Sequence, residues 1–339
     1  MNWYLENGKE SDIVLSTSIK LARNLEGYPF TNKCNVKQKE EILSKLEEIV
    51  PNLGYGLQIL KLKDMDNTSK QSLVEKNIIS IDFAEGDCES KAIITNKEEN
   101  ICIEVNGEDH LLLQVFSEGL AVDSLLNLAI EIDKKIETNL QYAYNQKYGY
   151  LTACPTNVGT GMHISTKVHL PALKITGNIN KILRIISNFG MTATGEYGEG
   201  YKAQGDIYQI CNNQTLGITE EEIAKNIIAI TEKVISGERE ARGYLGKSQI
   251  EFTNEVYRNF GLLKYSKILT LDECIYLLSS IKLGTDMGII KELDDSKVKK
   301  LYLYTKPANL QKYFGQEMNQ KEQNIKRCEI ITNIIENKI

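Results

Sequence analysis

The spacing of hydrophobic residues alternates between helical and strand-like over the first two thirds of the chain. Apolar side chains follow helical spacing over 36–50, and Pro51 is expected to end that helix. Similar spacing predicts helices at 70–76, 122–146, 178–189 and 219–235, the last opened by a capping box of Thr219 and Glu222. Apolar or alternating runs predict strands at 78–83, 92–95, 101–105, 111–116, 164–170 and 206–211. Asn106-Gly107 is typical of a turn between two of these strands.

The last third of the chain predicts helices only, at 248–264, 270–283 and 319–337. A charged, glycine-bounded segment at 237–246 is a candidate domain boundary. Mixed elements followed by helices alone indicate an α+β fold with an α-helical C-terminal domain. We expect the first domain to span 1–240 and the helical domain to span 245–339.

Composition restricts the class of protein. The chain has 339 residues, of which 42% are hydrophobic and 25% charged, as in ordinary globular proteins. A net charge of −6 does not suggest binding to nucleic acid or to an anionic membrane, and no apolar run approaches membrane-spanning length. The first residues are polar and unlike a signal peptide, and the seven cysteines form no regular framework. We expect a cytoplasmic protein with reduced thiols.

One stretch, 151–170 (LTACPTNVGTGMHISTKVHL), carries candidate chemistry. Cys154 is either a reactive thiol or a small buried apolar residue. Gly159 and Gly161 precede the alternating run, and glycines there let the backbone come close to a ligand. The order CPTNVGTG resembles the CP[ST]N[LV]GTG segment of the ATP:guanidino phosphotransferases, or phosphagen kinases. The longer stretch resembles their bacterial protein arginine kinase branch.

The resemblance implies an antiparallel sheet flanked by helices, then a helical domain used for dimerisation. It also implies transfer of the ATP γ-phosphate to a guanidinium, with MgATP as the phosphate donor. Asn106–His110 resembles the family's NEEDH motif, so Glu108 matches the guanidinium-binding base, while Gly107 replaces the first glutamate. Residues 195–200 resemble a G-x-Y-G-E-G loop, so Glu199 matches the second guanidinium partner. Cys154 matches the pocket cysteine.

The positions that match the family's phosphate-binding arginines differ here. Five of those arginines are replaced, by Ser18, Lys20, Leu112, His163 and Thr194. The resemblance also assigns nucleotide-binding positions to Ser16, Thr17, Ile19, Asn77, Ile164, Ser165, Thr166, Lys167, Gly195, Glu196, Tyr197 and Gly198. An arginine acting on a transferring phosphoryl group is worth about 10³–10⁵ in rate. We therefore expect little phosphoryl transfer and impaired MgATP binding.

The C-terminal region shows a similar loss. Protein arginine kinases carry an RDxxRA signature that binds phosphoarginine, and the matching segment here is 323–328, QNIKRC. Gln323 and Asn324 replace the leading arginine and aspartate, Lys326 occupies an unspecified position of the signature, and Arg327 survives. We expect phosphoarginine sensing to be impaired.

Three hypotheses about function follow. The first is a pseudokinase that retains the guanidinium pocket and binds an arginine-containing protein or a partner subunit. The second is an active arginine kinase whose phosphate clamp is rebuilt from lysines, since only six of the 40 basic residues are arginine. The third is a structural subunit without a ligand. We expect a homodimer, no resident metal, and Glu108, Glu199 and Cys154 in one pocket, with the carboxylates within about 12 Å.

Overall fold

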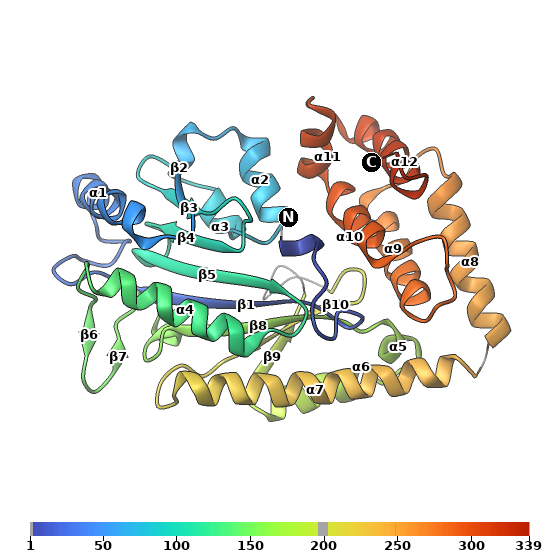
Figure 1. Ribbon diagram of the computed structural model, residues 1–339, viewed down its shortest axis with the longest axis horizontal. Coiled ribbons are helices and arrows are strands. Elements are labelled where there is room, and N and C mark those ends of the chain that lie inside the picture. Colours follow the sequence, from blue (N-terminus) through green and yellow to red (C-terminus); the bar gives the residue numbers. More distant parts are fainter. Residues whose placement is uncertain (1–2, 196–202, 248, 339) are drawn as a thin grey trace.

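An eight-stranded antiparallel sheet dominates the computed structural model, which describes residues 3–195, 203–247 and 249–338 (Figure 1). Its strand order is β2-β3-β4-β5-β1-β8-β10-β9. The strands are β1 (Val14–Arg23), β2 (Gln58–Lys61), β3 (Ala92–Thr95), β4 (Ile101–Val105), β5 (Leu111–Glu118), β8 (Met162–His169), β9 (Met191–Thr194) and β10 (Ile207–Asn212). A separate hairpin pairs β6 (Tyr144–Asn145) with β7 (Gly149–Tyr150).

Helices surround this sheet and then continue alone. Those of the first part are α1 (Val36–Leu53), α2 (Asn67–Glu75), α3 (Ile81–Ala84), α4 (Val122–Glu137), α5 (Pro171–Ile175), α6 (Ile179–Asn188) and α7 (Glu220–Leu245). The helical unit, residues 249–338, contains α8 (Gln249–Tyr265), α9 (Leu271–Asp286), α10 (Asp295–Tyr304), α11 (Pro307–Phe314) and α12 (Gln320–Ile335). The expected α+β fold, an antiparallel sheet flanked by helices and followed by a helical region, is confirmed.

The two faces of the sheet differ because side chains alternate along each strand. On one face, Ile19 and Leu21 of β1 join a large core under α4 and α7. On the other face, Phe116 of β5 belongs to a smaller core with Trp3 and Phe83. This smaller core covers only part of the second face, and the uncovered part forms the floor of a cleft.

Several predicted boundaries are wrong. The run 78–83 is not a strand, because Ser80 caps the short helix α3 by accepting a hydrogen bond from the N–H of Phe83 at 3.1 Å. Helix α1 continues past Pro51 to Leu53, since a proline in the last turn costs only one backbone hydrogen bond. Helix α4 ends at Glu137, well before residue 146. The predicted helix at 219–235 has its capping box but extends to Leu245.

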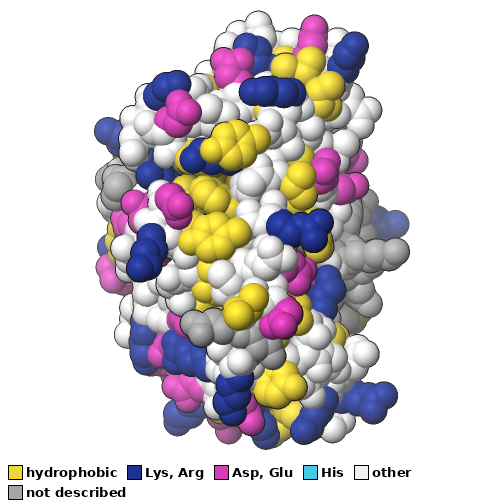
Figure 2. Space-filling view, turned by 90° about the vertical axis from the view of Figure 1, so that its right-hand side faces the viewer, with side chains coloured by type: hydrophobic (Ala, Val, Ile, Leu, Met, Phe, Trp, Pro, Cys, Tyr) yellow, Lys and Arg dark blue, Asp and Glu magenta, His cyan; other side chains and the backbone are white. Residues whose placement is uncertain are grey.

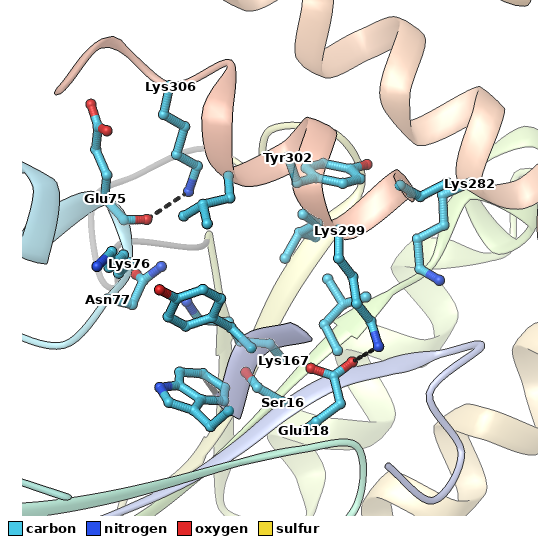
Figure 3. Close-up of a pocket in the computed structure, with 16 residues that line it drawn as sticks. Ser16, Glu75, Lys76, Asn77, Glu118, Lys167, Lys282, Lys299, Tyr302 and Lys306 are labelled. Atoms are coloured by element: carbon cyan, nitrogen blue, oxygen red, sulfur yellow. Dashed lines mark hydrogen bonds and ion pairs between the residues drawn. The ribbon is translucent and has the colours of Figure 1, made fainter. Parts of the chain in front are cut away.

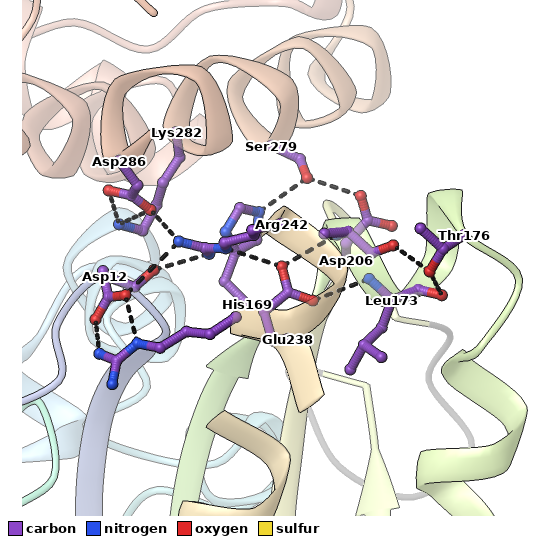
Figure 4. A network of polar contacts seen from close by, with 12 residues as sticks. Asp12, His169, Leu173, Thr176, Asp206, Glu238, Arg242, Ser279, Lys282 and Asp286 are labelled. Carbon is purple, nitrogen blue, oxygen red and sulfur yellow. Dashed lines mark hydrogen bonds and ion pairs between the residues drawn. The ribbon is translucent and has the colours of Figure 1, made fainter. Parts of the chain in front are cut away.

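The segment 237–246, considered above as a boundary, forms the end of α7 and carries buried charges (Figure 4). The carboxylate of Glu238 accepts hydrogen bonds from the backbone N–H groups that open α5 and from Arg242 Nε at 3.0 Å. Arg242 also pairs with Asp286 of α9 at 3.5 Å, and Lys282 of α9 pairs with Asp286 at 3.2 Å. Buried ion pairs therefore connect α7 to the helical unit.

Further hydrogen bonds of Ser279 and Glu75 attach the helical unit to the sheet domain. Ser279 of α9 donates to Asp206 at 2.7 Å and lies 2.9 Å from His169 Nε2 at the end of β8 (Figure 4). Glu75 of α2 accepts from the N–H groups of Ala308 and Asn309, which open α11, at 2.7 and 2.8 Å. Among the described helices, none is long and apolar enough to cross a membrane.

Candidate functional site

The floor of the cleft is formed by β1 and its neighbour β8. Their antiparallel register places Ser18 opposite Ser165 and Lys20 opposite His163. Lys20, His163 and Ser165 line a cleft of about 680 Å³. The same strand periodicity places candidate nucleotide-binding side chains side by side on one face.

Alternate residues of the same strands point away from this floor. Thr17 donates a hydrogen bond to the carbonyl of Gly119 at 2.6 Å, and Thr166 lies 3.0 Å from the hydroxyl of Thr231 in α7. Ile19 and Ile164 are fully buried in the large core. The side chains of these four predicted positions thus face the helix layer, and only their backbone borders the floor.

A smaller cavity of about 210 Å³ adjoins the cleft, with Lys20 and Asp82 common to both. Ser16, Ser18, Asn77 and Lys167 line this smaller cavity. These four positions, which the resemblance assigns to the nucleotide, therefore lie beside the cleft that Lys20, His163 and Ser165 line. Asn77 has a left-handed backbone conformation, φ +58°, at the end of α2.

One wall of the cleft is the turn between β4 and β5. Glu108 of this turn is exposed, whereas Asp109 is buried. Asp109 Oδ1 accepts hydrogen bonds from Asn24 Nδ2 and from the N–H of Ala153, both at 2.6 Å. Asp109 therefore ties this turn to the residue that precedes Cys154.

The segment 153–161, called the strap below, closes the cleft on the same side. Cys154 is half-buried, and its Sγ lies 3.0 Å from Thr156 Oγ1. Asn157 and Gly161 line the cleft, whereas Cys154 stands at the start of the strap. Glu199 lies outside the described residues, as do Glu196, Tyr197 and Gly198. The convergence of Glu108, Glu199 and Cys154 stays a prediction.

The strap glycines allow close contact with other backbone segments. Gly161 has φ +61°, and a Cβ there would lie 2.6 Å from the carbonyl oxygen of Ala22. Gly159 has φ +116°, and a Cβ there would lie 2.2 Å from the carbonyl oxygen of Thr215. No L-amino acid, which carries a Cβ, fits this geometry. These glycines thus serve backbone packing, which differs from the ligand approach expected above, although Gly161 also borders the cleft.

Glu104 of β4 is a cleft residue that the sequence analysis missed. Its Oε1 accepts from the N–H of Ser80 at 3.2 Å and from Gln114 Nε2 at 3.0 Å. Burial raises the pKa of Glu104 to about 6, although Lys20 opposes this shift. Although Glu108 is exposed, partial desolvation of its carboxylate, with Asp109 and Asp82 nearby, raises its pKa as well. No local pattern marks Glu104, since it lies within an apolar strand.

The acidic groups outnumber the basic groups around the cleft. Among the described lining residues, four are acidic, namely Asp82, Glu104, Glu108 and Asp109. Two are lysines, namely Lys20 and Lys91. Lys91 Nζ donates to the carbonyls of Phe83 and Glu85, both at 3.1 Å, so its ammonium is already engaged. This electrostatic balance favours a cationic ligand.

His163 adds little positive charge. Its Nδ1 lies 3.2 Å from the carbonyl of Asn212, and its Nε2 lies 2.9 Å from Asn157 Oδ1. Burial lowers the pKa of His163 below its ordinary value, and Lys20 acts in the same direction. The ring is therefore neutral near pH 7 and held between two asparagines.

The remaining arginine-replaced positions carry no charge. Leu112 lines the cleft and pairs with Glu104 across the sheet. Thr194 pairs with Gln209 at the far edge of the sheet and donates to the carbonyl of Gly195 at 3.3 Å. At Gly107, a Cβ would lie 3.1 Å from the Phe83 ring, so a larger side chain requires that ring to shift.

A cavity of about 140 Å³ lies where the helical unit meets the sheet domain (Figure 3). Ser16, Asn77 and Lys167 border it from the sheet domain. Lys299 of α10 reaches in and pairs with Glu118 at 2.8 Å, and burial raises the pKa of Glu118 to about 7. The sequence analysis did not predict that the helical unit would contribute residues beside the cleft, because this proximity arises from tertiary packing.

The candidate phosphoarginine positions hold the helical unit together. Arg327 is buried, and its guanidinium donates to the carbonyls of Thr305 and Leu269 at 2.8 and 2.7 Å and to Asn324 Oδ1 at 2.8 Å. Gln323 donates to the carbonyl of Met318 at 3.0 Å, and Lys326 pairs with Glu329 at 2.7 Å. Arg327 thus already has three internal acceptors.

Comparison with known proteins gives concordant matches along the chain. Residues 38–241 match the family model of the ATP:guanido phosphotransferase C-terminal catalytic domain. Residues 249–338 match that of the protein-arginine kinase McsB C-terminal domain. The protein-arginine kinase of Halothermothrix orenii is 43% identical over 332 residues, 97% of this chain and 95% of the relative. That of Clostridium acetobutylicum is 40% identical over 331 residues, 96% of this chain and 97% of the relative.

Solved structures resemble about two thirds of the chain. Lombricine kinase superposes with a TM-score of 0.59 at 22% identity, covering 68% of this chain and 67% of the other. The duplicated taurocyamine kinase of Schistosoma mansoni gives a TM-score of 0.60 at 22% identity, covering 69% of this chain and 34% of the other. At this identity the likeness shows the fold alone.

Proposed function

The chain belongs to the ATP:guanido phosphotransferase family, in its protein-arginine kinase branch, and from this premise we propose that it is a pseudokinase that binds arginine side chains without phosphorylating them. Its ligand is an arginine on another protein or on a partner subunit. The family reaction needs two capacities, a carboxylate site for the guanidinium and a cationic clamp for the triphosphate. This chain retains residues for the first capacity and lacks those for the second.

The observation that carries the proposal is the acidic lining of the cleft. The described lining has four carboxylic acids against Lys20 and Lys91, and Lys91 already donates to two carbonyls. A guanidinium is a cation and is attracted by such a lining, whereas a triphosphate is repelled. The residues therefore fit arginine and do not fit ATP, even though ATP is the phosphate donor that the family implies.

The carboxylate side also has structural support. Asp109 connects Asn24 to Ala153, so the turn that carries Glu108 is held beside the strap that carries Cys154. In this proposal Glu108 receives the guanidinium, and Cys154 and Glu199 complete the pocket. A hydrogen bond to a charged group contributes roughly 1.5–3 kcal/mol, so Glu108→Gln should weaken arginine binding about tenfold to a hundredfold.

The test combines transfer and binding. Wild-type protein is incubated with ATP labelled in its γ-phosphate and an arginine-rich acceptor protein, and we expect no label above that given by Glu108→Gln. In parallel, a peptide with one arginine should bind wild-type protein and bind Glu108→Gln more weakly. Transfer at rates typical of kinases, about 1 s⁻¹ or faster, would overturn the proposal.

The alternative function is an active kinase with a lysine clamp. Its specific support is that Lys20 borders the cleft and that Lys167 borders both adjoining cavities. A lysine is a point charge and not a planar fork, so it replaces a bidentate arginine poorly. This alternative predicts that the wild-type protein transfers the labelled phosphate and that Lys20→Met abolishes the transfer. The pseudokinase proposal predicts no transfer by either protein.

We also propose that the helical unit forms a homodimer interface. It exposes large apolar side chains, among them Ile250 at 81%, Tyr265 at 70% and Ile268 at 57% of their surface. Figure 2, viewed from the right-hand side of Figure 1, shows hydrophobic side chains spread along this face of the molecule. Exposed apolar area of this kind is typical of interfaces. Light scattering coupled to size exclusion should give the dimer mass, and a monomer at high concentration would contradict this.

A further inference from the structure

The strap has a second face, which borders a different hollow. While Asn157 and Gly161 line the cleft, Gly159 and Thr160 line a groove of about 430 Å³. This groove lies between the β6–β7 hairpin, the strap and the first turn of α7. Two residues of extended chain span at most about 7 Å, so the groove and the cleft are separated by little more than the strap itself.

Tyrosine rings form one side of the groove. Tyr144, Tyr148 and Tyr150 line it. Tyr144 is 58% exposed and Tyr148 is 46% exposed. The rings of Tyr144 and Tyr150 pack edge to face, with centroids 5.3 Å apart. The hairpin therefore presents large aromatic faces to solvent beside the strap.

The inner face of this aromatic cluster already binds a guanidinium. Arg23 lies over the Tyr150 ring with its Cζ 3.6 Å from the centroid, and it pairs with Asp133 at 2.8 Å. Arg23 Nη1 also donates to the carbonyl of Thr160 at 3.0 Å. On the outer side, the ammonium of Lys147 lies 5.2 Å from the centroid of the Tyr148 ring. Cationic side chains of the same protein thus contact tyrosine rings on both the inner and the outer side of this cluster.

Carboxylates complete the outer side of the groove. Glu220 and Glu222, in the first turn of α7, line it together with one lysine, Lys147. Glu222 accepts from the N–H of Thr219 at 2.9 Å as part of the capping box. Tyr150 and Glu220 line the same groove. Burial is the main reason that the pKa of Tyr150 is raised, and Glu220 contributes to the same shift.

We propose that this groove is a docking site for a second cationic side chain, arginine or lysine, of the arginine-bearing protein whose first arginine enters the cleft. The inference rests on the proposed function and names how that partner is recognised. The rings of Tyr144 and Tyr148 would contact the cationic side chain as the Tyr150 ring contacts Arg23. The carboxylate of Glu220 would pair with it as Asp133 pairs with Arg23. The net negative charge of the groove is complementary to such a side chain.

Binding at two linked points has a specific consequence. Once the first arginine is held, the second side chain is presented to the groove at a high effective concentration, so a weak second contact raises the affinity of the whole peptide. A protein with neighbouring basic residues would be favoured over one with an isolated arginine. The groove would thus select among arginine-bearing partners without touching the guanidinium in the cleft.

The experiment uses three probes on the full chain: free arginine, a Gly/Ser peptide with one arginine, and a Gly/Ser peptide with two arginines, made with two, four or six residues between them. We expect at least one two-arginine peptide to bind about tenfold more tightly than the one-arginine peptide. Tyr144→Ala, Tyr148→Ala and Glu220→Gln should each weaken the two-arginine peptide about two- to fivefold and leave free arginine unaffected.

Two further variants sharpen the test. Lys147→Ala should strengthen binding of the two-arginine peptide, because it removes the internal cation that occupies Tyr148. Tyr276→Ala is the matched control, since Tyr276 in α9 is also 58% exposed but does not line the groove. It should change nothing. The altered side chains are at least partly exposed, and thermal unfolding of each variant checks that the fold is intact.

The outcomes separate the two proposals. If free arginine binds but no spacing gives a gain from the second arginine, the groove is not a docking site and the proposed function stands. If the two-arginine peptide responds to Tyr144→Ala but not to Glu108→Gln, the groove binds cations and the cleft assignment fails. If none of the probes binds, both proposals are wrong.

Discussion

The two ends of the cleft differ in how their side chains are held. At the carboxylate end, Asp109 accepts two hydrogen bonds of 2.6 Å that join three separate segments of the chain. At the other end, Ser18 lines the smaller cavity and Leu112 lines the cleft, and both lie on strands whose alternate residues form the core. Removing the Asp109 carboxylate would disturb the fold, whereas replacing a floor residue leaves the core intact. A strand can thus lose its ligand-binding face and keep its packing.

The largest expected effect comes from restoring charge at the five positions where the family carries phosphate-binding arginines. Changing Ser18, Lys20, Leu112, His163 and Thr194 to arginine together should raise MgATP affinity by at least about 10³, because each charge-assisted contact contributes roughly 1.5–3 kcal/mol. Calorimetric titration with MgATP measures this. Glutamine at the same five positions is the control for size without charge. Catalysis should lag behind binding, since Gly107 also differs from the family pattern. Failure to gain affinity would mean that the floor has changed in shape as well as charge.

The second prediction concerns the support of the strap. Arg23 is buried, pairs with Asp133 at 2.8 Å and donates to Thr160 of the strap at 3.0 Å. Arg23→Met should lower the free energy of unfolding by about 3–5 kcal/mol, because it leaves Asp133 buried and unpaired. Arg184→Met is the control, since Arg184 of α6 is exposed and should cost little. Urea unfolding compares the two. Equal effects would show that Arg23 does not support the carboxylate end.

A third prediction uses pH. Because the folded-state pKa of Glu104 is raised from 4.5 to about 6, the folded protein binds more protons than the unfolded chain between these values. The contribution of Glu104 to stability is therefore present below pH 4.5 and lost as pH rises through 6, about 2 kcal/mol in all. Glu104→Gln keeps both hydrogen-bond donors satisfied and should remove this loss. Urea unfolding at pH 5 and pH 7.5 should show a smaller decline for the variant, and parallel declines would contradict the assignment.

The smallest effect should follow from a single restored arginine. Leu112 pairs across the sheet with Glu104, so an arginine at 112 would meet a carboxylate before it met a phosphate. We expect Leu112→Arg to raise MgATP affinity less than about tenfold. The double change with Glu104→Gln should give a larger gain, because the competing carboxylate is removed. MgATP titration of both variants gives the comparison, and a large gain from Leu112→Arg alone would count against this pairing.

Local pattern predicted most of the fold but not all element boundaries. Strong signals such as the capping box of Thr219 and the turn at Asn106-Gly107 were confirmed. The prediction of a strand at 78–83 was wrong, because the periodicity of a short apolar segment does not distinguish a strand from a buried turn. Helix α4 ended early because Thr138 and Asn139 donate hydrogen bonds back to its last turn, at 2.8 and 2.9 Å. Helices α10 and α11 were missed, because each is short.

The site was predictable only where residues lie within a motif. The motifs identified Glu108, Lys20 and His163, and the register of β1 and β8 brings the last two together. Sequence could not reveal Glu104 or Lys299, because they meet the cleft and its neighbouring cavity through packing between segments far apart in the chain. Strand alternation explains why Thr17 and Ile164 point away from the floor, a distinction that a motif match alone does not make.

The central claim is that the cleft binds an arginine side chain and not ATP, and one calorimetric experiment on the wild-type protein tests it. A one-arginine peptide and MgATP are titrated separately into the same preparation at pH 7.5. The account predicts saturable binding of the peptide and no binding heat from MgATP up to millimolar concentration. Micromolar binding of MgATP would contradict it, because the floor would then hold a triphosphate without the five arginines.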